Sequence, residues 1–481
     1  MIPIDLLVLG GGVTGLGIAR LAARHGWQVT LLERDDLASG ASSATSHMLH
    51  GGVRYLERGQ FTLVREALAE RAAVSRMAPG LARPTRFMVP LSRGARVPGW
   101  KLGLGLTVYD VLAGSANLSP HRMIAARDAL ALEPALASNG LLGAGMYSDV
   151  VMDDARLAIA VAQDAAAHGA SIHTHSELIA VRPADDGHEV QWRDRDTGED
   201  QRAIARVILN ATGSWTDATR TALTRMLRPG SPDPSPLLRP SRGIHLVYPT
   251  LTRGHAVLDL TPDGRVLFVI PFAGRSLVGT TEVEVDSPPT SEQRAPSFDE
   301  ARSLHAALSR VMPGAAETRP FAVFTGIRPL LSAAGSVGGA SREHSVLREG
   351  RVLTVAGGKY TTFRAMARDA FVAAAEILGR DRAPRDSTAL LPLPPPEDAD
   401  GPTLAAHAAA TWARTLPDAL RRRSTRWLDT DRGLGIAPAV AEAMARRLGW
   451  SGERIREELD RYESTVREEH DWLARALPPG A

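Results

Sequence analysis

The chain of 481 residues contains no cysteine, which excludes disulfide bonds, thiolate metal ligands and a thiol nucleophile. No apolar run approaches the roughly 18 residues that a membrane-spanning helix needs. The formal charge is only +2, with 56 basic against 54 acidic residues, so charge gives no reason to expect a nucleic-acid partner. The first residues do not show the pattern of a secretory signal, which is a charged region followed by an apolar stretch and a cleavage site. The early apolar run is expected to be the first strand instead.

Lysine is almost absent as well. The chain has two lysines, Lys101 and Lys359, and arginine occupies every other lysine-or-arginine position. Lys359, within AGGKYTT, is therefore expected to be needed as lysine, because a compact ammonium with a tunable pKa differs from a planar guanidinium. Chance retention is the alternative.

The first forty residues fit a dinucleotide-binding unit. Residues 4–9 form an apolar run typical of a strand buried on both faces, and Gly10, Gly12 and Gly15 then fit G-x-G-x-x-G. This spacing predicts a tight turn, a close backbone approach to a pyrophosphate and a helix N-terminus that favours an anion. A helix and a second strand lead to Glu33, an acid placed to hold ribose hydroxyls.

Later segments favour FAD over a nicotinamide cofactor. Residues 206–212 predict a buried strand that ends in NATG, and residues 352–362 predict a strand, a glycine turn and the start of a helix. Such turns can present N–H groups to a flavin ring or a phosphate. We therefore expect the nucleotide fold to be assembled from both ends of the chain, with other segments inserted between.

Several motifs between residue 4 and about residue 370 carry a family resemblance. They read GGGVTGLGIA, SSATSHMLHGGVRYLE, DDARLAIA, NATGSW, RGIHLVYP, VIPF followed by VGTTEVE, TGIRPLL, SREHSV and GGKYTTFR. The chain resembles the FAD-dependent glycerol-3-phosphate dehydrogenase family, within the glycine oxidase and D-amino-acid oxidase-like flavoproteins. The resemblance implies FAD-dependent oxidation of sn-glycerol 3-phosphate to dihydroxyacetone phosphate by hydride transfer to flavin N5, with quinone as acceptor. The alternatives are another phosphorylated alcohol or an amine as substrate, or oxygen as acceptor.

The residues expected to contact FAD lie at the glycine turns and in the serine-rich segment after the second strand. They are Gly10, Gly12, Thr14, Gly15, Glu33, Arg34, Ser42, Ser43, Ser46, His47, Ala211, Gly213, Gly357, Gly358, Thr361 and Thr362. His47 is a departure, because the family usually has lysine at this position. An imidazole in place of an ammonium can change the flavin potential, the acceptor or the substrate preference.

The oxidation of a secondary alcohol by a flavin needs an oriented substrate, a base for the hydroxyl proton and cations for the phosphate. Arginine binds phosphate oxygens in pairs, which fixes orientation. The matching motifs imply four phosphate-binding cations, which are Arg54, Arg328, Arg342 and Lys359.

Two histidines, His50 and His245, are candidates for the base, and the sequence does not choose between them. The unperturbed pKa of histidine, near 6.5, suits this role. Tyr55 is expected to donate a hydrogen bond to the substrate, with core packing as the alternative. Arg54 and Lys359 complete the expected catalytic set, and Thr280 and Thr281 are expected to line the same cavity.

Residues 97–112, which read VPGWKLGLGLTVYDVL, predict either a membrane-surface helix or a buried helix. Trp100 and Tyr109, with leucines between them and Lys101 alongside, suit a contact in which aromatic rings lie among lipid headgroups. The family is typically membrane-associated. We expect a cytoplasmic protein. The alternative, which the resemblance supports, is a peripheral position on the cytoplasmic face of the inner membrane.

The expected fold class is α/β, with a discontinuous Rossmann-like FAD-binding domain, an inserted antiparallel-sheet substrate domain and a short C-terminal helical domain. The expected boundaries are 1–80, 150–235 and 345–390 for the FAD-binding domain, 81–149 and 236–344 for the substrate-binding and cap segments, 391–402 for a stiff proline-rich linker, and 403–481 for the helical domain. The last segment resembles only part of the family's C-terminal domain, which leaves a homodimer open. No metal-ligand cluster stands out.

Overall fold

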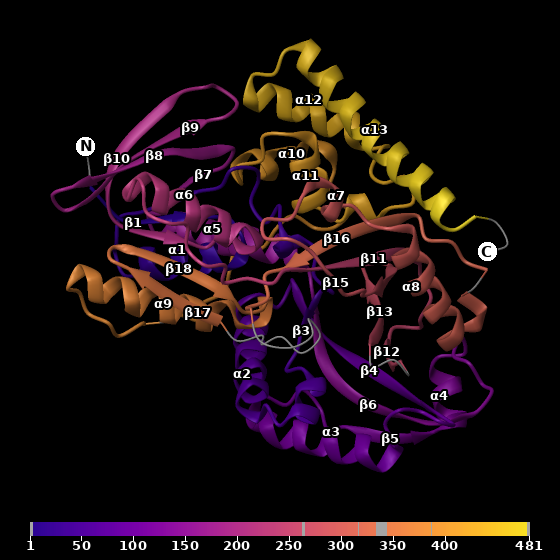
Figure 1. Cartoon of the computed structure of the whole chain (residues 1–481). Coiled ribbons are helices and arrows are strands. Elements are labelled where there is room, and N and C mark those ends of the chain that lie inside the picture. Colours follow the sequence, from indigo (N-terminus) through magenta and orange to yellow (C-terminus); the bar gives the residue numbers. More distant parts are fainter. Residues whose placement is uncertain (1–2, 262–264, 316, 333–343, 386, 479–481) are drawn as a thin grey trace.

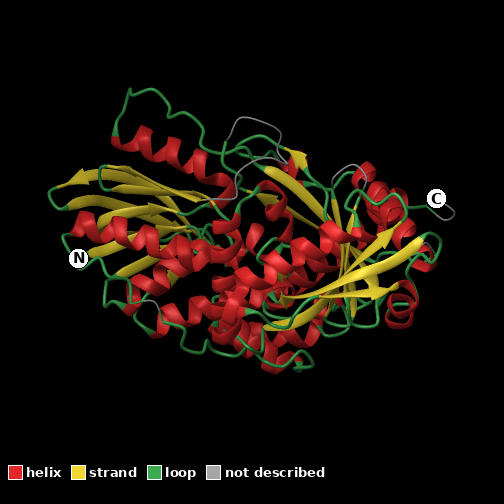
Figure 2. Cartoon of the chain, turned by 90° about the horizontal axis from the view of Figure 1, so that it is seen from below, coloured by secondary structure: helices red, strands yellow, loops and turns green. Residues whose placement is uncertain are grey.

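The computed structural model describes residues 3–261, 265–315, 317–332, 344–385 and 387–478. Figure 2 shows the strands gathered in two groups, one toward each end of the molecule, with helices between and around them. These two groups correspond to two sheets. The half built on the first sheet contains the glycine turn that is expected to bind a dinucleotide, and we call it the nucleotide-binding half. The second half is built on the other sheet.

The first sheet has eight strands and combines segments from distant parts of the chain (Figure 1). Its main path runs through β17 (His344–Glu349), β18 (Val352–Gly357), β10 (Asp200–Asn210), β1 (Ile4–Leu9), β2 (Val29–Leu32) and β7 (Ser171–His173), while β8 (Ser176–Ala184) and β9 (Gly187–Asp194) extend from β10. From β18 to β7 the strands of this path are parallel. Their carboxyl ends therefore meet at one edge of the sheet.

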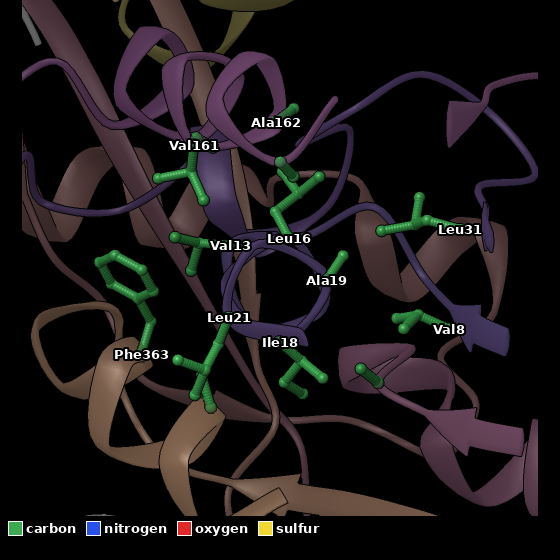
Figure 3. Packing of buried hydrophobic residues seen from close by; sticks show 14 of the residues in the cluster. Val8, Val13, Leu16, Ile18, Ala19, Leu21, Leu31, Val161, Ala162 and Phe363 are labelled. Atoms are coloured by element: carbon green, nitrogen blue, oxygen red, sulfur yellow. The ribbon is translucent and has the colours of Figure 1, made fainter. Parts of the chain in front are cut away.

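Helix α1 fills the centre of this half, and ten of its twelve residues are buried. Figure 3 shows it end-on, between Val8 and Leu31 of the sheet, Val161 and Ala162 of a second helix, and Phe363 of a third. The three helices are α1 (Val13–Arg24), α5 (Asp154–Ala167) and α9 (Phe363–Leu378), and α6 (Thr216–Leu227) also belongs to this half.

The start of α1 lies against the end of β1. A β-carbon on Gly15 would come within 2.1 Å of the carbonyl oxygen of Gly10, so that any larger residue would separate the helix from the strand. Gly10 itself has a φ of +107°, a conformation that favours glycine. The glycine spacing therefore has the packing role that the sequence predicts.

The second sheet has ten strands and is mainly antiparallel. Its path runs through β15 (Val283–Glu284), β11 (Ser241–Pro249), β14 (Arg275–Gly279), β13 (Val266–Phe272), β12 (Ala256–Leu260), β4 (Ala82–Ser92), β6 (Leu141–Met152) and β3 (Met48–Leu49), with β16 (Ala322–Arg328) beside β11 and β5 (Arg122–Ala125) beside β6. The helices of this half are α2 (Phe61–Met77), α3 (Gly99–Ala113), α4 (Ala126–Leu132), α7 (Ser291–Arg294) and α8 (Phe298–Val311).

The carboxyl-terminal helices form a separate cluster that reaches back to the nucleotide-binding half (Figure 1). They are α10 (Gly401–Ala410), α11 (Leu416–Arg422), α12 (Ala437–Leu448) and α13 (Gly452–Ala476). Asp36, four residues after β2, accepts hydrogen bonds from Arg422 at 2.5 Å and from Arg423 Nη2 at 2.7 Å. Asp36 and Arg423 are both fully buried, so this ion pair holds the helical cluster against the loop after β2.

We expect Asp36→Ala to lower the free energy of unfolding by about 3–5 kcal/mol, because it leaves the buried guanidinium of Arg423 without its counter-charge. Chemical denaturation would measure this loss. Asp35→Ala is the matched control: Asp35 pairs with Arg195 at 2.8 Å, but its side chain is 52% exposed. This exposed pair should contribute less than about 1 kcal/mol. Equal losses in the two variants would contradict the assignment.

Candidate active site

A cavity of about 620 Å³ lies at the edge of the first sheet where the parallel strands end. Gly10 follows β1, Glu33 follows β2, Ala211 follows β10 and Gly358 follows β18, and all four line the cavity. In open α/β sheets, ligands bind at this edge. The cavity thus results from sheet topology.

The N-terminus of α1 opens into this cavity. Gly12, Val13 and Thr14 line it, and the backbone N–H of Val13 donates to Ser42 Oγ at 2.9 Å. Free N–H groups at a helix start, with the helix dipole behind them, favour an anion. Ser42 and this helix start are therefore suited to a pyrophosphate.

Glu33 is fixed at the end of β2 by two backbone groups. Its carboxylate accepts a hydrogen bond from Gly11 N at 2.7 Å and another from Asp35 N at 2.9 Å. Burial raises the pKa of Glu33, and these two hydrogen bonds act in the opposite direction. An oriented acceptor at this place matches the ribose of a dinucleotide.

His245 lies on β11, and its side chain lines the same cavity from the second sheet. Its Nε2 lies 2.9 Å from Ser46 Oγ, and its ring stacks on Phe324 with 4.8 Å between ring centroids. Burial lowers the pKa of His245 well below 6.5, and the positive charge of Arg328 lowers it further. Both effects favour the uncharged form of the imidazole over the protonated one.

Arg328 ends β16 beside His245 and also lines the cavity. Its guanidinium donates to Thr280 Oγ1 at 2.7 Å and to the carbonyl oxygen of Thr281 at 3.2 Å. A β-carbon on Gly243 would come within 2.4 Å of the same guanidinium, so glycine there provides the room for it. The two threonines therefore fix the direction of the guanidinium.

His50 and Lys359 line the cavity from two further segments. The backbone N–H of His50 donates to Thr361 Oγ1 at 3.3 Å, which joins the two segments. Lys359 Nζ lies 5.1 Å from the ring centre of Tyr55. The structure therefore brings His50, His245, Arg328 and Lys359 around one cavity, although about 300 residues separate the first from the last.

Other predicted residues lie elsewhere. Arg54 and Tyr55 are not among the described residues that line the cavity. Both are half-buried in the turn that follows His50. Ser43 faces a neighbouring cavity of about 410 Å³. Gly15 and Thr362 are buried behind the lining. Arg342 lies outside the described residues.

The other residues predicted to contact FAD do line the cavity. They are Gly10, Gly12, Thr14, Glu33, Arg34, Ser42, Ser46, Ala211, Gly213, Gly357, Gly358 and Thr361.

His47, by contrast, packs into the second half of the molecule. Its side chain is buried, its Nδ1 lies 3.1 Å from the carbonyl oxygen of Met152, and its ring centroid is 4.3 Å from that of Phe272. It is not among the described residues that line the cavity, although its neighbour Ser46 is.

Sequence reasoning missed several lining residues, including Ser176, Leu178, Trp215, Leu223 and Met226. Only Trp215 lies within a quoted motif, NATGSW. The others come from β8 and α6, whose sequences carry no nucleotide-binding signal. The apolar side chains of Leu178, Leu223 and Met226 give the cavity a wall suited to a planar ring.

Comparison with known proteins identifies the family to which this chain belongs. The sequence profile of the FAD dependent oxidoreductase family matches residues 5–370. The chain belongs to this family. FAD is thus its cofactor, and the helix start, the oriented Glu33 and the apolar wall fit that molecule.

Over the aligned residues, about one position in three is identical between this chain and its curated relatives. Glycerol-3-phosphate dehydrogenase 2 of Mycobacterium tuberculosis is 36% identical over 393 residues, which cover 79% of this chain and 64% of the relative. The mitochondrial glycerol-3-phosphate dehydrogenase of Rattus norvegicus is 34% identical over 388 residues, which cover 76% of this chain and 52% of the relative. The match therefore spans less than two thirds of the length of these relatives.

Solved structures show the same fold. A glycerol-3-phosphate dehydrogenase from Bacillus halodurans complexed with FAD has a TM-score of 0.69 and 22% identity, with 98% of this chain and 96% of that chain covered. A glycine oxidase from Geobacillus kaustophilus has a TM-score of 0.58 and 22% identity, covering 81% of this chain and 98% of that one. The predicted α/β flavoprotein fold, with an inserted antiparallel sheet and a C-terminal helical region, is confirmed.

The lowered pKa of His245 predicts a dependence of stability on pH. Below the unfolded pKa near 6.5, the unfolded chain binds a proton at this histidine that the folded state does not. The free energy of unfolding therefore decreases as the pH is lowered. The slope from this residue is at most about 1.4 kcal/mol per pH unit. We expect His245→Gln to remove it, so that the variant gains about 1–2 kcal/mol relative to the unmodified protein between about pH 8 and about pH 5.

Chemical denaturation at the two pH values would test this expectation. His470→Gln is the control, because the side chain of His470 is 76% exposed, and it should leave the dependence unchanged. The expectation fails if the His245 variant follows the unmodified protein at both pH values.

Proposed function

We propose that this FAD-dependent oxidoreductase oxidises sn-glycerol 3-phosphate to dihydroxyacetone phosphate and passes the electrons to a quinone. The observation that carries the proposal is that the buried His245 and the oriented cation Arg328 line the same cavity suited to FAD. A base and a phosphate-binding cation at one place match the two polar ends of this substrate. The glycerol-3-phosphate dehydrogenases among the relatives support the same substrate.

In this proposal the cations hold the substrate phosphate. Arg328 contributes a planar guanidinium fixed by two threonines, and Lys359 contributes a compact ammonium from the segment after β18. Arg54 and Arg342 are further candidates, on the resemblance of their motifs. A phosphate held in this way fixes the orientation of the carbinol carbon, which lowers the entropic part of the barrier.

The carbinol loses a proton and a hydride in the same overall step. His245 is the better candidate for the proton, because its ring lines the cavity and is oriented by Ser46 Oγ, 2.9 Å from its Nε2. His50 remains the second candidate, since it also lines the cavity. Bound FAD supplies the hydride acceptor at N5, and Tyr55 supports Lys359 through its ring rather than from the cavity lining.

Helix α3 supports a peripheral membrane position. Trp100, Leu104 and Val111 are spaced along one face and are 73%, 59% and 74% exposed. No helix in the described part of the chain is long and apolar enough to cross a bilayer. We propose that this stripe rests on the cytoplasmic surface of a membrane, where a quinone is accessible. The expectation that Tyr109 lies among headgroups is wrong, because its side chain is buried on the opposite face of α3.

The decisive test is an anaerobic spectrum of the FAD-loaded protein with sn-glycerol 3-phosphate, where we expect the flavin band near roughly 450 nm to bleach. Arg328→Ala should keep FAD but weaken apparent substrate affinity roughly 10- to 100-fold, because it removes a charged hydrogen-bonding partner of the phosphate. Arg127→Ala, on an arginine whose side chain is 93% exposed, is the control.

Each contrary result removes a different part of the proposal. An unchanged affinity in the Arg328 variant would overturn the phosphate assignment, and a persistent band in the unmodified protein would overturn the substrate. Reoxidation of the reduced protein by air as fast as by a quinone would overturn the proposed acceptor.

The membrane proposal is tested on α3 alone. We expect Trp100→Ser with Leu104→Ser to weaken co-sedimentation with phosphatidylcholine–phosphatidylglycerol vesicles by at least about tenfold, because each buried apolar side chain contributes about 1.5–3 kcal/mol. Leu390→Ser with Leu393→Ser is the control, since these leucines are equally exposed, at 69% and 68%, but lie outside α3. Equal binding by both double variants would exclude α3 as the contact.

A further inference from the structure

A buried hydrogen-bonded chain runs from α3 to the backbone beside His50. The N–H of Gly51 donates to the hydroxyl of Tyr109 at 2.8 Å, and that hydroxyl donates to Asp149 Oδ2, also at 2.8 Å. Tyr109 is 2% exposed and Asp149 is 1% exposed. The chain therefore joins α3 and β6 to the peptide that follows His50, away from solvent.

Arg71 of α2 completes this chain. Its Nη1 donates to Asp149 Oδ1 at 2.7 Å, while its Nη2 donates to the carbonyl oxygen of Ala116 at 2.6 Å. Arg71 has no exposed surface. Burial raises the pKa of Asp149, whereas the charges of Arg71 and Lys359 favour its carboxylate form. The contacts of the carboxylate are thus with Arg71 and with the Tyr109 hydroxyl.

Such a buried ion pair is costly, because two charges leave water. An apolar core would fill the same space at a smaller cost. What the ion pair adds is a fixed acceptor for Tyr109, which in turn gives Gly51 its partner. The N–H of His50 is fixed on the neighbouring peptide by Thr361, two residues after Lys359.

We propose that Tyr109 and Asp149 are positioning residues, which hold the His50–Gly51 peptides in the geometry that substrate oxidation requires. The inference rests on the proposed function, because it concerns the rate of that reaction. Neither residue lines the described part of the cavity, and so both act through the peptide that follows His50, whose N–H belongs to Gly51.

Tyr109→Phe is the direct test, because it removes one hydroxyl and keeps the ring. Tyr147→Phe is the matched control: Tyr147 is 2% exposed, packs edge-on against Tyr109 at 5.8 Å, and is not the tyrosine that accepts from Gly51. Asp149→Asn is a second variant, which keeps the shape but removes the charge. All are compared as FAD-loaded protein under anaerobic conditions.

We expect the limiting rate of flavin reduction by sn-glycerol 3-phosphate to fall roughly 10- to 100-fold in Tyr109→Phe, as for a small misplacement of a reacting group. Apparent affinity for the substrate should change far less, because Arg328 is held by Thr280 and Thr281 in another part of the chain. Asp149→Asn should follow the same pattern. Tyr147→Phe should keep the rate of the unmodified protein.

The outcomes separate this inference from the proposed function. If the unmodified protein is not reduced, the proposed function fails and the inference falls with it. If the unmodified protein is reduced and Tyr109→Phe reacts equally fast, only the inference is overturned. Equal slowing in Tyr109→Phe and Tyr147→Phe would also overturn it, because loss of core packing would then explain both.

Discussion

The parallel pairing of β1 with β10, and of β10 with β18, is the constraint on which the rest of the structure depends. Leu9 pairs with Asn210, and Asn210 pairs with Thr354, so that three segments far apart in sequence end at one edge of the sheet. Each then turns through glycines or small residues into a helix. Because parallel strands all point the same way, the loops that follow them lie at the same edge of the sheet. These loops enclose a cavity suited to a dinucleotide.

Two buried ion pairs then fix loops that the sheet leaves unsupported. Asp36 with Arg423 ties the segment after β2 to the carboxyl-terminal helices, and Asp149 with Arg71 supports the tyrosine that holds Gly51. Charges with no access to water are stable only when their partners are in place. Each pair therefore specifies one arrangement of its loop more strongly than apolar contacts would.

Helix α3 combines two roles on opposite faces. Trp100, Leu104 and Val111 are exposed on one face, while Tyr109 is buried on the other and contacts the backbone beside His50. In Figure 1, α3 lies at the outer side of the molecule beside α2, remote from the carboxyl-terminal helices. The surface proposed to contact lipid is therefore linked by one helix to the proposed reaction site.

The sequence by itself determined the glycine turn after β1, the acid at Glu33 and the family resemblance, because these depend on local spacing and on backbone conformations that few residues adopt. It also indicated Arg328, Lys359 and both histidines through their motifs. Tertiary structure alone decided that His47 packs on Phe272, and that Tyr109 is buried. Burial and the pKa of His245 likewise depend on strands that meet only in the folded chain, since each neighbour comes from a distant segment.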